Sequence, residues 1–187
     1  MKNLAIDRLA IALCQATKET LEKGIGQDVT YVKTIQDIPR VSIRPDLGCF
    51  VQFYGDYNGL VAFSFSDESA LYLYRNYMLT MGMPAEGLAV NATSAEVADS
   101  IGELTNQILG CAMRMVESEY DLNAKFGQPK ALTLSNGITL VPEASTGVVG
   151  AGSGASAFDN RRIVFKLEES RFYLELAMEH IAFILID

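Results

Sequence analysis

The sequence has few of the residues from which metal and redox sites are built. It contains no tryptophan, one histidine (His180) and three cysteines in 187 residues. The cysteines, Cys14, Cys49 and Cys111, are far apart, and no Cys-x-x-Cys pair occurs. This spacing argues against a disulfide framework and suits a reducing compartment. Because His180 is next to no cysteine, a metal site is not expected, and all three thiols are predicted to be small buried hydrophobic groups.

Positive charge is also scarce. The chain has 15 Lys and Arg residues against 23 Asp and Glu residues, which gives a formal net charge of -8 at pH 7. A general nucleic-acid binder needs a cationic face to displace counterions, so that class is not expected. Adsorption to an anionic membrane surface is disfavoured for the same reason.

Long hydrophobic runs are missing as well. Asp7 and Arg8 interrupt the apolar residues near the N-terminus, and Leu13 is not the small residue that a cleavage site before Cys14 would need. No run approaches the ~18 apolar residues of a membrane span. The overall balance, 49% hydrophobic and 20% charged, is that of an ordinary globular protein. We predict a cytoplasmic protein with one domain over residues 1–187.

Hydrophobic periodicity predicts three helices and several strands. The helices are expected at 4–22, ended by Gly24, at 67–81, and at 97–116 after a capping box in which the Thr93 hydroxyl bonds the Glu96 amide. Strands are expected at 28–34, 49–54, 60–66, 132–134, 138–140, 162–167, 172–178 and 181–186. Turn residues predict hairpins around 55–59 and 135–137.

This order of elements predicts an α+β fold in which helices pack on an antiparallel sheet. No linker divides the chain. Residues 144–158 are mostly Gly, Ser, Ala and Val and are expected to form a mobile loop. The segment 150–153 is followed by no Lys-Ser or Lys-Thr pair, so it is not a Walker loop.

The third predicted helix carries a narrow polar stripe. Asp99, Glu103 and Asn106 are spaced i, i+4 and i+7, so they lie in a row opposite the apolar face. Gly102 borders the stripe and Gly110 continues it, although a glycine inside a helix costs about 1 kcal/mol relative to alanine. Either the glycines let a partner approach, or the stripe is only a solvated face and the glycines fit a crowded packing contact.

The same residues match a known pattern, Asp/Ser-x3-Glu-x2-Asn-x22-Pro. Here it is Asp99, Glu103, Asn106 and Pro129, with every gap preserved. In this pattern the chain resembles the CheC/CheX/FliY phosphatases. The sequence around the motif, 101–110, and the segment 58–66 also resemble that family, and the similarity spans about residues 4–140.

The resemblance implies the CheC/CheX-like fold and an activity. A phosphatase of this type would hydrolyse the aspartyl phosphate of a CheY-like response regulator, in a two-component pathway such as chemotaxis. Asn106 would orient the attacking water and Glu103 would pair with the receiver's lysine. Asp99, Gly102 and Gly110 would support the helix surface or touch the partner, and Pro129 would start a strand.

The resemblance also bears on cofactors and assembly. No cofactor is expected on this chain, since Mg²⁺ would be bound by the receiver. The first predicted helix has no Glu-x2-Asn, so the chain resembles the single-site CheX type, which forms a homodimer. Cys111-Ala112 replaces the Asn-Ala that the family often has after the glycine.

Three other functions remain open from the residues. The chain could be a non-catalytic binding module that docks to a receiver domain or a signalling assembly. It could be a structural dimer whose acidic stripe is merely solvated. A small-molecule enzyme is the weakest alternative, because the sequence offers no clear Ser/His/Asp set and no phosphate-binding loop.

Overall fold

The computed structural model describes residues 5–142, 157–181 and 183. Its α-helices are α1 (Ala5–Ile25), α2 (Asp67–Thr80) and α3 (Ala95–Tyr120), and a short 3₁₀ helix, η1, covers Ala85–Gly87. The strands are β1 (Thr30–Tyr31), β2 (Gln36–Asp37), β3 (Val41–Ile43), β4 (Leu47–Gly55), β5 (Gly59–Phe65), β6 (Ala124–Phe126), β7 (Lys130–Thr133), β8 (Ile138–Leu140), β9 (Phe158–Leu167) and β10 (Ser170–Glu179).

The main sheet is antiparallel and follows the order β1-β9-β10-β5-β4-β6, with β2 also paired to β9 and β7 to β4. The hairpin β9–β10 thus lies between strands from the first third of the chain. Its register sets Phe172 opposite Phe165 on β9 and opposite Phe65 on β5. These three rings stack, with centroids 4.8 Å and 5.2 Å apart.

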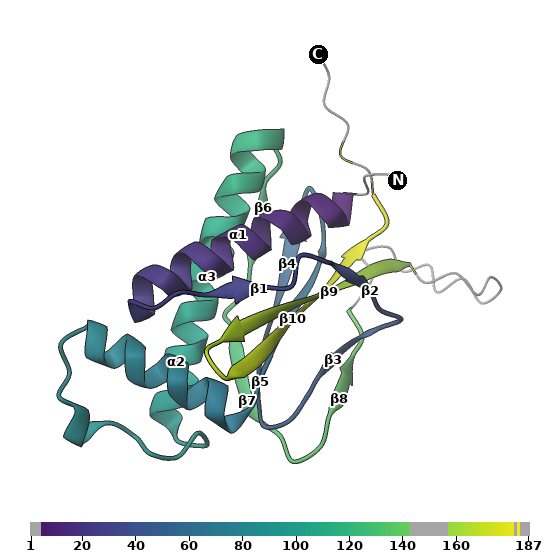
Figure 1. Cartoon of the computed structure of the whole chain (residues 1–187). Coiled ribbons are helices and arrows are strands. Elements are labelled where there is room, and N and C mark those ends of the chain that lie inside the picture. Colours follow the sequence, from purple (N-terminus) through teal and green to yellow (C-terminus); the bar gives the residue numbers. More distant parts are fainter. Residues whose placement is uncertain (1–4, 143–156, 182, 184–187) are drawn as a thin grey trace.

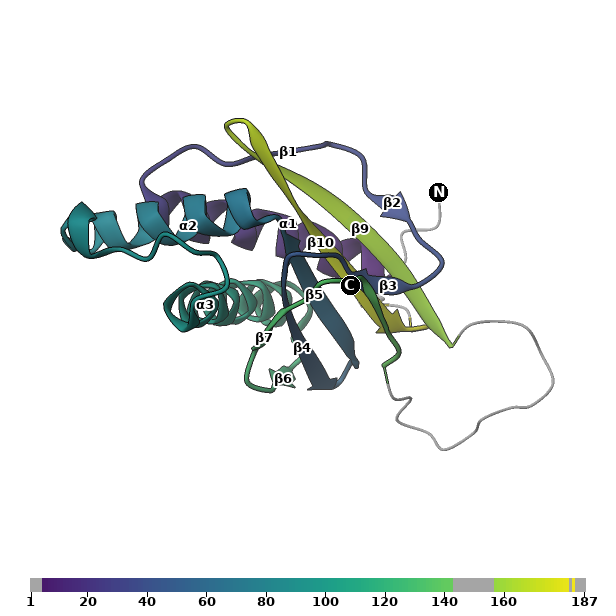
Figure 2. The same ribbon diagram turned by 90° about the horizontal axis from the view of Figure 1, so that it is seen from below.

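The two faces of the sheet are covered differently (Figures 1 and 2). The three helices pack on one face, where the alternate residues Val61, Phe63 and Phe65 of β5 enter the larger core. Leu60 and Ala62 point to the other face, where the small β3–β8 sheet covers them. The predicted α+β fold, with helices on an antiparallel sheet, is therefore confirmed.

The ends of two helices differ from the prediction. Gly24 lies inside α1, which continues to Ile25 and is followed by Gly26 in the left-handed conformation at φ 65°. Gly26 ends the helix because it adopts positive φ without steric cost. At the start of α3 the cap is Ser94, whose hydroxyl accepts from the Val97 amide, and not Thr93, which bonds to Asn91.

The predicted hairpin around 135–137 is wrong. β7 and β8 do not pair with each other: β7 extends the main sheet beside β4, and β8 pairs with β3 on the opposite face. The apolar side chains of Ile138 and Leu140 pack against the cluster that contains Val41 and Ile43. Tertiary burial of these side chains outweighs the local turn signal.

Some of the other predicted strands are present in the structure and some are not. The hairpin β4–β5 and the strands at 162–167 and 172–178 are confirmed, whereas the strand expected at 28–34 shrinks to the two residues of β1. The strand expected at 181–186 falls mostly outside the described residues, and Ile181 and Phe183, which are described, are not in a strand. Nearly all of the loop expected at 144–158 also falls outside them, and Phe158 begins β9.

Ion pairs fasten the first residues of the chain to the last hairpin. Arg161 of β9 is largely buried and donates to Asp7 on α1 and to Asp37 on β2. On the far face, Arg162 pairs with Glu175, which is 1% exposed and also accepts from the Ser42 amide. Since an unpaired buried carboxylate is costly, these partners fix how β3 lies over the sheet.

Candidate functional site

Helix α3 separates its residues into two faces, as the spacing predicts. Its buried side packs on the sheet and on α1 through Val97, Ile101, Leu104, Ile108 and Ala112. Asp99, Glu103 and Asn106 are exposed on the other side. The polar stripe therefore lies at the protein surface, where another molecule can reach it.

The four residues of the sequence pattern share one pocket. A cavity of about 330 Å³ between α3 and the start of β7 is lined by Ala98, Asp99, Gly102, Glu103, Asn106, Gln128, Pro129 and Ala131. Pro129 immediately precedes β7, whose first residue pairs with Phe50 of β4. The fixed φ of proline suits the entry to such a strand. The 22-residue gap thus returns the chain from α3 to the same pocket.

The two glycines have different surroundings. A Cβ atom added to Gly102 would meet nothing within 4 Å, so no packing contact requires glycine there. This finding removes the crowded-packing explanation at Gly102. A Cβ atom on Gly110 would lie 3.5 Å from Arg114 Nη1 and 4.0 Å from Phe126 Cζ, an ordinary contact distance.

Glu103 is held in place by neighbours on the same surface. Gln107 Nε2 donates to Glu103 Oε1 over 2.9 Å, and it is 3.4 Å from the Tyr77 hydroxyl oxygen of α2. Glu103 and Gln107 are one helical turn apart, which allows this i, i+4 bond. The Gln107 amide therefore occupies one carboxylate oxygen of Glu103, and within the described part of the chain the other oxygen, Oε2, has no hydrogen-bond partner.

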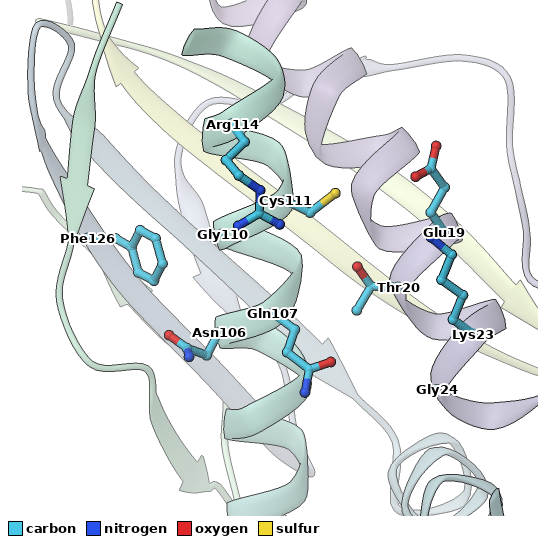
Figure 3. A pocket seen from close by; sticks show the side chains of 10 residues that line it. All are labelled: Glu19, Thr20, Lys23, Gly24, Asn106, Gln107, Gly110, Cys111, Arg114 and Phe126. Atoms are coloured by element: carbon cyan, nitrogen blue, oxygen red, sulfur yellow. The ribbon is translucent and has the colours of Figure 1, made fainter. Parts of the chain in front are cut away.

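A second pocket, of about 690 Å³, opens on the other side of Asn106 between α1 and α3 (Figure 3). It is lined by Glu19, Thr20, Lys23 and Gly24 of α1, by Asn106, Gln107, Gly110, Cys111 and Arg114 of α3, and by Phe126 of β6. Asn106 is the one residue of the pattern that borders both pockets. The amide thus stands on the ridge between them.

The thiols are not alike. Burial raises the pKa of Cys14 and of Cys49 to about 11. Cys111 is only half-buried and lines the larger pocket, so the prediction that all three thiols are buried is wrong for Cys111. The Cys111 side chain points from α3 toward α1 (Figure 3).

Three residues of this surface were not assigned a role from the sequence. Gln107 and Arg114 flank the polar stripe, and the hydroxyl of Tyr77 reaches it from α2. The i, i+4 spacing of Glu103 and Gln107 could have indicated from the sequence that Gln107 bonds to Glu103.

Among the described residues, no helix combines the length and hydropathy that crossing a membrane requires. In residues 5–142, 157–181 and 183, no group of three or more His, Cys, Asp or Glu side chains is placed to hold a metal ion.

Several solved structures share this fold. CheX from Desulfovibrio desulfuricans is 19% identical, with a TM-score of 0.69 over 91% of this chain and 99% of that one. A CheC-like superfamily protein from Shewanella sp. PV-4 is 14% identical, with a TM-score of 0.71 over 92% and 97%. CheX in the Borrelia burgdorferi CheX–CheY–BeF3–Mg²⁺ complex is 12% identical, with a TM-score of 0.58 over 91% and 97%. At these identities the likeness shows the fold.

At the level of sequence, no curated protein matches the chain. A family model described as "Protein of unknown function (DUF3334)" matches residues 2–187. The resemblance to CheC and CheX proteins is confirmed in the fold and extends past residue 140, since the neighbours cover about nine-tenths of the chain. The chain belongs to the family described as protein of unknown function (DUF3334), and it has the fold of the CheX and CheC-like chemotaxis proteins.

Proposed function

We propose that this protein is a phosphatase that hydrolyses the aspartyl phosphate of a CheY-like response regulator. The observation that carries the proposal is the shared pocket of Asp99, Glu103, Asn106 and Pro129, with Glu103 and Asn106 exposed beside the open surface at Gly102. An open surface pocket lined by exposed polar side chains suits a substrate that is itself a protein surface. A small substrate would need a deeper, more enclosed site.

Asn106 would act by positioning. Its amide oxygen accepts a hydrogen bond from water and its NH₂ group donates one, so it can hold a water in line with the phosphorus atom. The water oxygen bonds to phosphorus while the bond to the aspartyl oxygen breaks, which releases inorganic phosphate and restores the carboxylate. The receiver's Mg²⁺ and lysine supply most of the charge stabilisation.

Glu103 would fix how the two proteins dock. Gln107 holds Oε1 of this carboxylate, so the carboxylate is oriented before the partner arrives. Pairing with the receiver's lysine would set the register and bring Asn106 over the phosphoryl group. Asp99, one turn earlier and on the same pocket wall, would contact the partner's rim or support this surface.

The relatives support this choice of partner. A fold neighbour is described in a complex with CheY, BeF3 and Mg²⁺, and others are described as chemotaxis proteins. By the same reasoning, we propose that this chain works in the cytoplasm, in chemotaxis or another two-component pathway. As in the single-site CheX type, we expect a homodimer, which light scattering would detect as twice the mass of 20.4 kDa.

A second function is favoured by the volume of the α1–α3 groove beside Asn106, about 690 Å³, which offers a docking surface that needs no chemistry. In this alternative the protein binds a receiver or a signalling assembly and leaves its phosphoryl group intact. The exposed amide of Asn106 has no evident use in that case.

The deciding experiment measures the loss of phosphoryl label from purified CheY-like receivers of the same organism. Wild type should accelerate the loss, and Asn106→Ala should remove about 100-fold or more of that acceleration while binding the receiver as before. Gln36→Ala, which removes an exposed amide on β2 beside β9, is the matched control and should behave as wild type. No acceleration by wild type with any receiver would favour the binding module.

A further inference from the structure

One cation of the larger pocket has no role in the mechanism above. Arg114 is exposed on α3, two turns beyond Asn106, and its side chain folds back along the helix toward Gly110 (Figure 3). Its Nη1 atom lies 3.5 Å from the place that a Cβ atom of Gly110 would occupy. The guanidinium therefore fills the space that the glycine leaves open.

This conformation brings the positive charge near the water-positioning amide. Gly110 and Asn106 are four residues apart on α3, which corresponds to about 6 Å along the helix axis and to the same side of the helix. Arg114 and Asn106 also line the same pocket. A phosphoryl group presented to Asn106 would lie within reach of the guanidinium after a change of rotamer.

Arg114 has no recorded carboxylate partner within the described residues, where the ion pairs involve Lys18, Arg161, Arg162 and His180. The pocket contains one other cation, Lys23, and one carboxylate, Glu19, both on α1. These two are spaced i, i+4, so each reduces the net field of the other. Arg114 thus places a positive charge in the pocket that Asn106 also lines, in a chain of net charge -8.

We propose that Arg114 contacts the phosphoryl group, or its mimic, on the bound receiver and stabilises the negative charge on the non-bridging oxygens that move with the phosphorus atom to water. The proposal rests on the proposed phosphatase function and adds a residue to it. An arginine fork donates two parallel hydrogen bonds to phosphate oxygens, a geometry that lysine does not reproduce. Loss of one such donor from phosphoryl transfer costs about 10- to 100-fold in rate at a partly exposed site.

The first experiment measures the steady-state rate at which wild type, Arg114→Gln and Arg114→Lys dephosphorylate one CheY-like receiver. We expect Arg114→Gln to lower kcat by about 10- to 100-fold with a smaller change in KM, and Arg114→Lys to restore part of that loss. Arg8→Gln is the matched control, because Arg8 is an exposed arginine on α1 far from the pocket. An active wild type with Arg114→Gln within twofold of it would overturn the inference.

A second measurement does not depend on turnover. Wild type should bind a receiver loaded with Mg²⁺ and BeF3 more tightly than the unloaded receiver, and Arg114→Gln should lose about tenfold of that preference. If Arg114→Gln kept the full preference for the BeF3-loaded receiver, this result would contradict the proposed contact between Arg114 and the anion. If wild type shows the Arg114-dependent preference but no turnover, the phosphatase proposal fails while the anion contact stands, so the two failures are distinguishable.

Discussion

Helices α1 and α3 pack side by side on the same face of the sheet (Figures 1 and 2). The polar residues on their surfaces differ in their hydrogen-bond partners. On α1, Lys18 and Glu22 pair with each other, and both bond to the backbone of Val29 in the following segment. On α3, Asp99 and Asn106 have no recorded bond to another side chain within the described residues, and Glu103 bonds only to its neighbour Gln107. Polar residues on α1 hold the fold, whereas those on α3 are available to a partner.

The contrast teaches that amphipathicity alone does not identify a functional helix. Both helices bury one apolar face, and both carry an interior glycine. What separates them is whether the polar groups are already satisfied inside the protein. The predictions below test this difference, from the largest expected effect to the smallest.

Thiol labelling compares the cysteines of the two helices. Cys14 of α1 is buried with a pKa raised to about 11, whereas Cys111 of α3 lines the larger pocket. Because thiolates are the reactive form, a maleimide at neutral pH should label Cys111 about 100-fold faster than Cys14. Mass spectrometry of the digested protein measures both rates, and Cys111→Ser should leave the native protein nearly unlabelled. Comparable labelling rates for Cys14 and Cys111 would mean that the groove does not make Cys111 more accessible than Cys14.

Removing a carboxylate from either helix should affect receiver binding unequally. Glu103→Ala should weaken affinity for the BeF3-loaded receiver by about tenfold, since it removes one charge-assisted contact at the interface. Glu19→Ala on α1 is the control and should not weaken it, because Glu19 adds negative charge beside the phosphoryl group. Titration by fluorescence anisotropy measures both. Equal losses for the two variants would contradict the assignment of the lysine-pairing role to Glu103.

The interior glycines offer a comparison in stability. Gly102→Ala should raise the free energy of unfolding by about 0.5–1 kcal/mol, since nothing within 4 Å opposes the new Cβ atom. Gly24→Ala should gain less, because its Cβ atom would lie 3.4 Å from both Leu104 Cδ2 and Tyr77 Cδ2. Urea denaturation measures both changes.

A larger side chain at Gly102 tests whether the partner docks there, because it should obstruct docking without lowering stability. Gly102→Leu should be as stable as Gly102→Ala, since leucine is a good helix former, but it should reduce turnover by obstructing the partner. Normal turnover in Gly102→Leu would show that the receiver does not approach this part of α3.

The smallest effect concerns the internal ion pair of α1. The hydrogen bond from Lys18, followed by that from the Val29 amide, lowers the pKa of Glu22. A lowered pKa in the folded state stabilises the protein above the ordinary glutamate pKa, and this stabilisation is lost as the pH falls through the folded-state value. Glu22→Gln should therefore lower Tm slightly at pH 7 and hardly at all near pH 3. A constant difference at both pH values would assign the effect to packing.

The fold class and the two faces of α3 could be predicted from the sequence, because each depends on spacing along a helix or on a resemblance. The pocket that joins Pro129 to the stripe could not, since it depends on how β7 returns to α3. Sequence reasoning also missed the pairing of β8 with β3, since the partner strand is almost a hundred residues away and the turn at 135–137 pointed to a local hairpin. Arg114 escaped notice for a related reason: its importance depends on folding back over Gly110, which a helical wheel does not display.

The position of the β9–β10 hairpin has a consequence for biosynthesis. Because this hairpin lies between β1 and β5, the sheet cannot close until residues 158–179 have left the ribosome. At roughly 5–20 residues per second, the residues between α1 and β9 take about 7–26 s to synthesise, and the apolar face of α1 waits that long for the strands on which it packs. Arg161 can join Asp7 and Asp37 only after this interval. The exposed face of α1 is thus expected to need a chaperone while the residues between α1 and β9 are made.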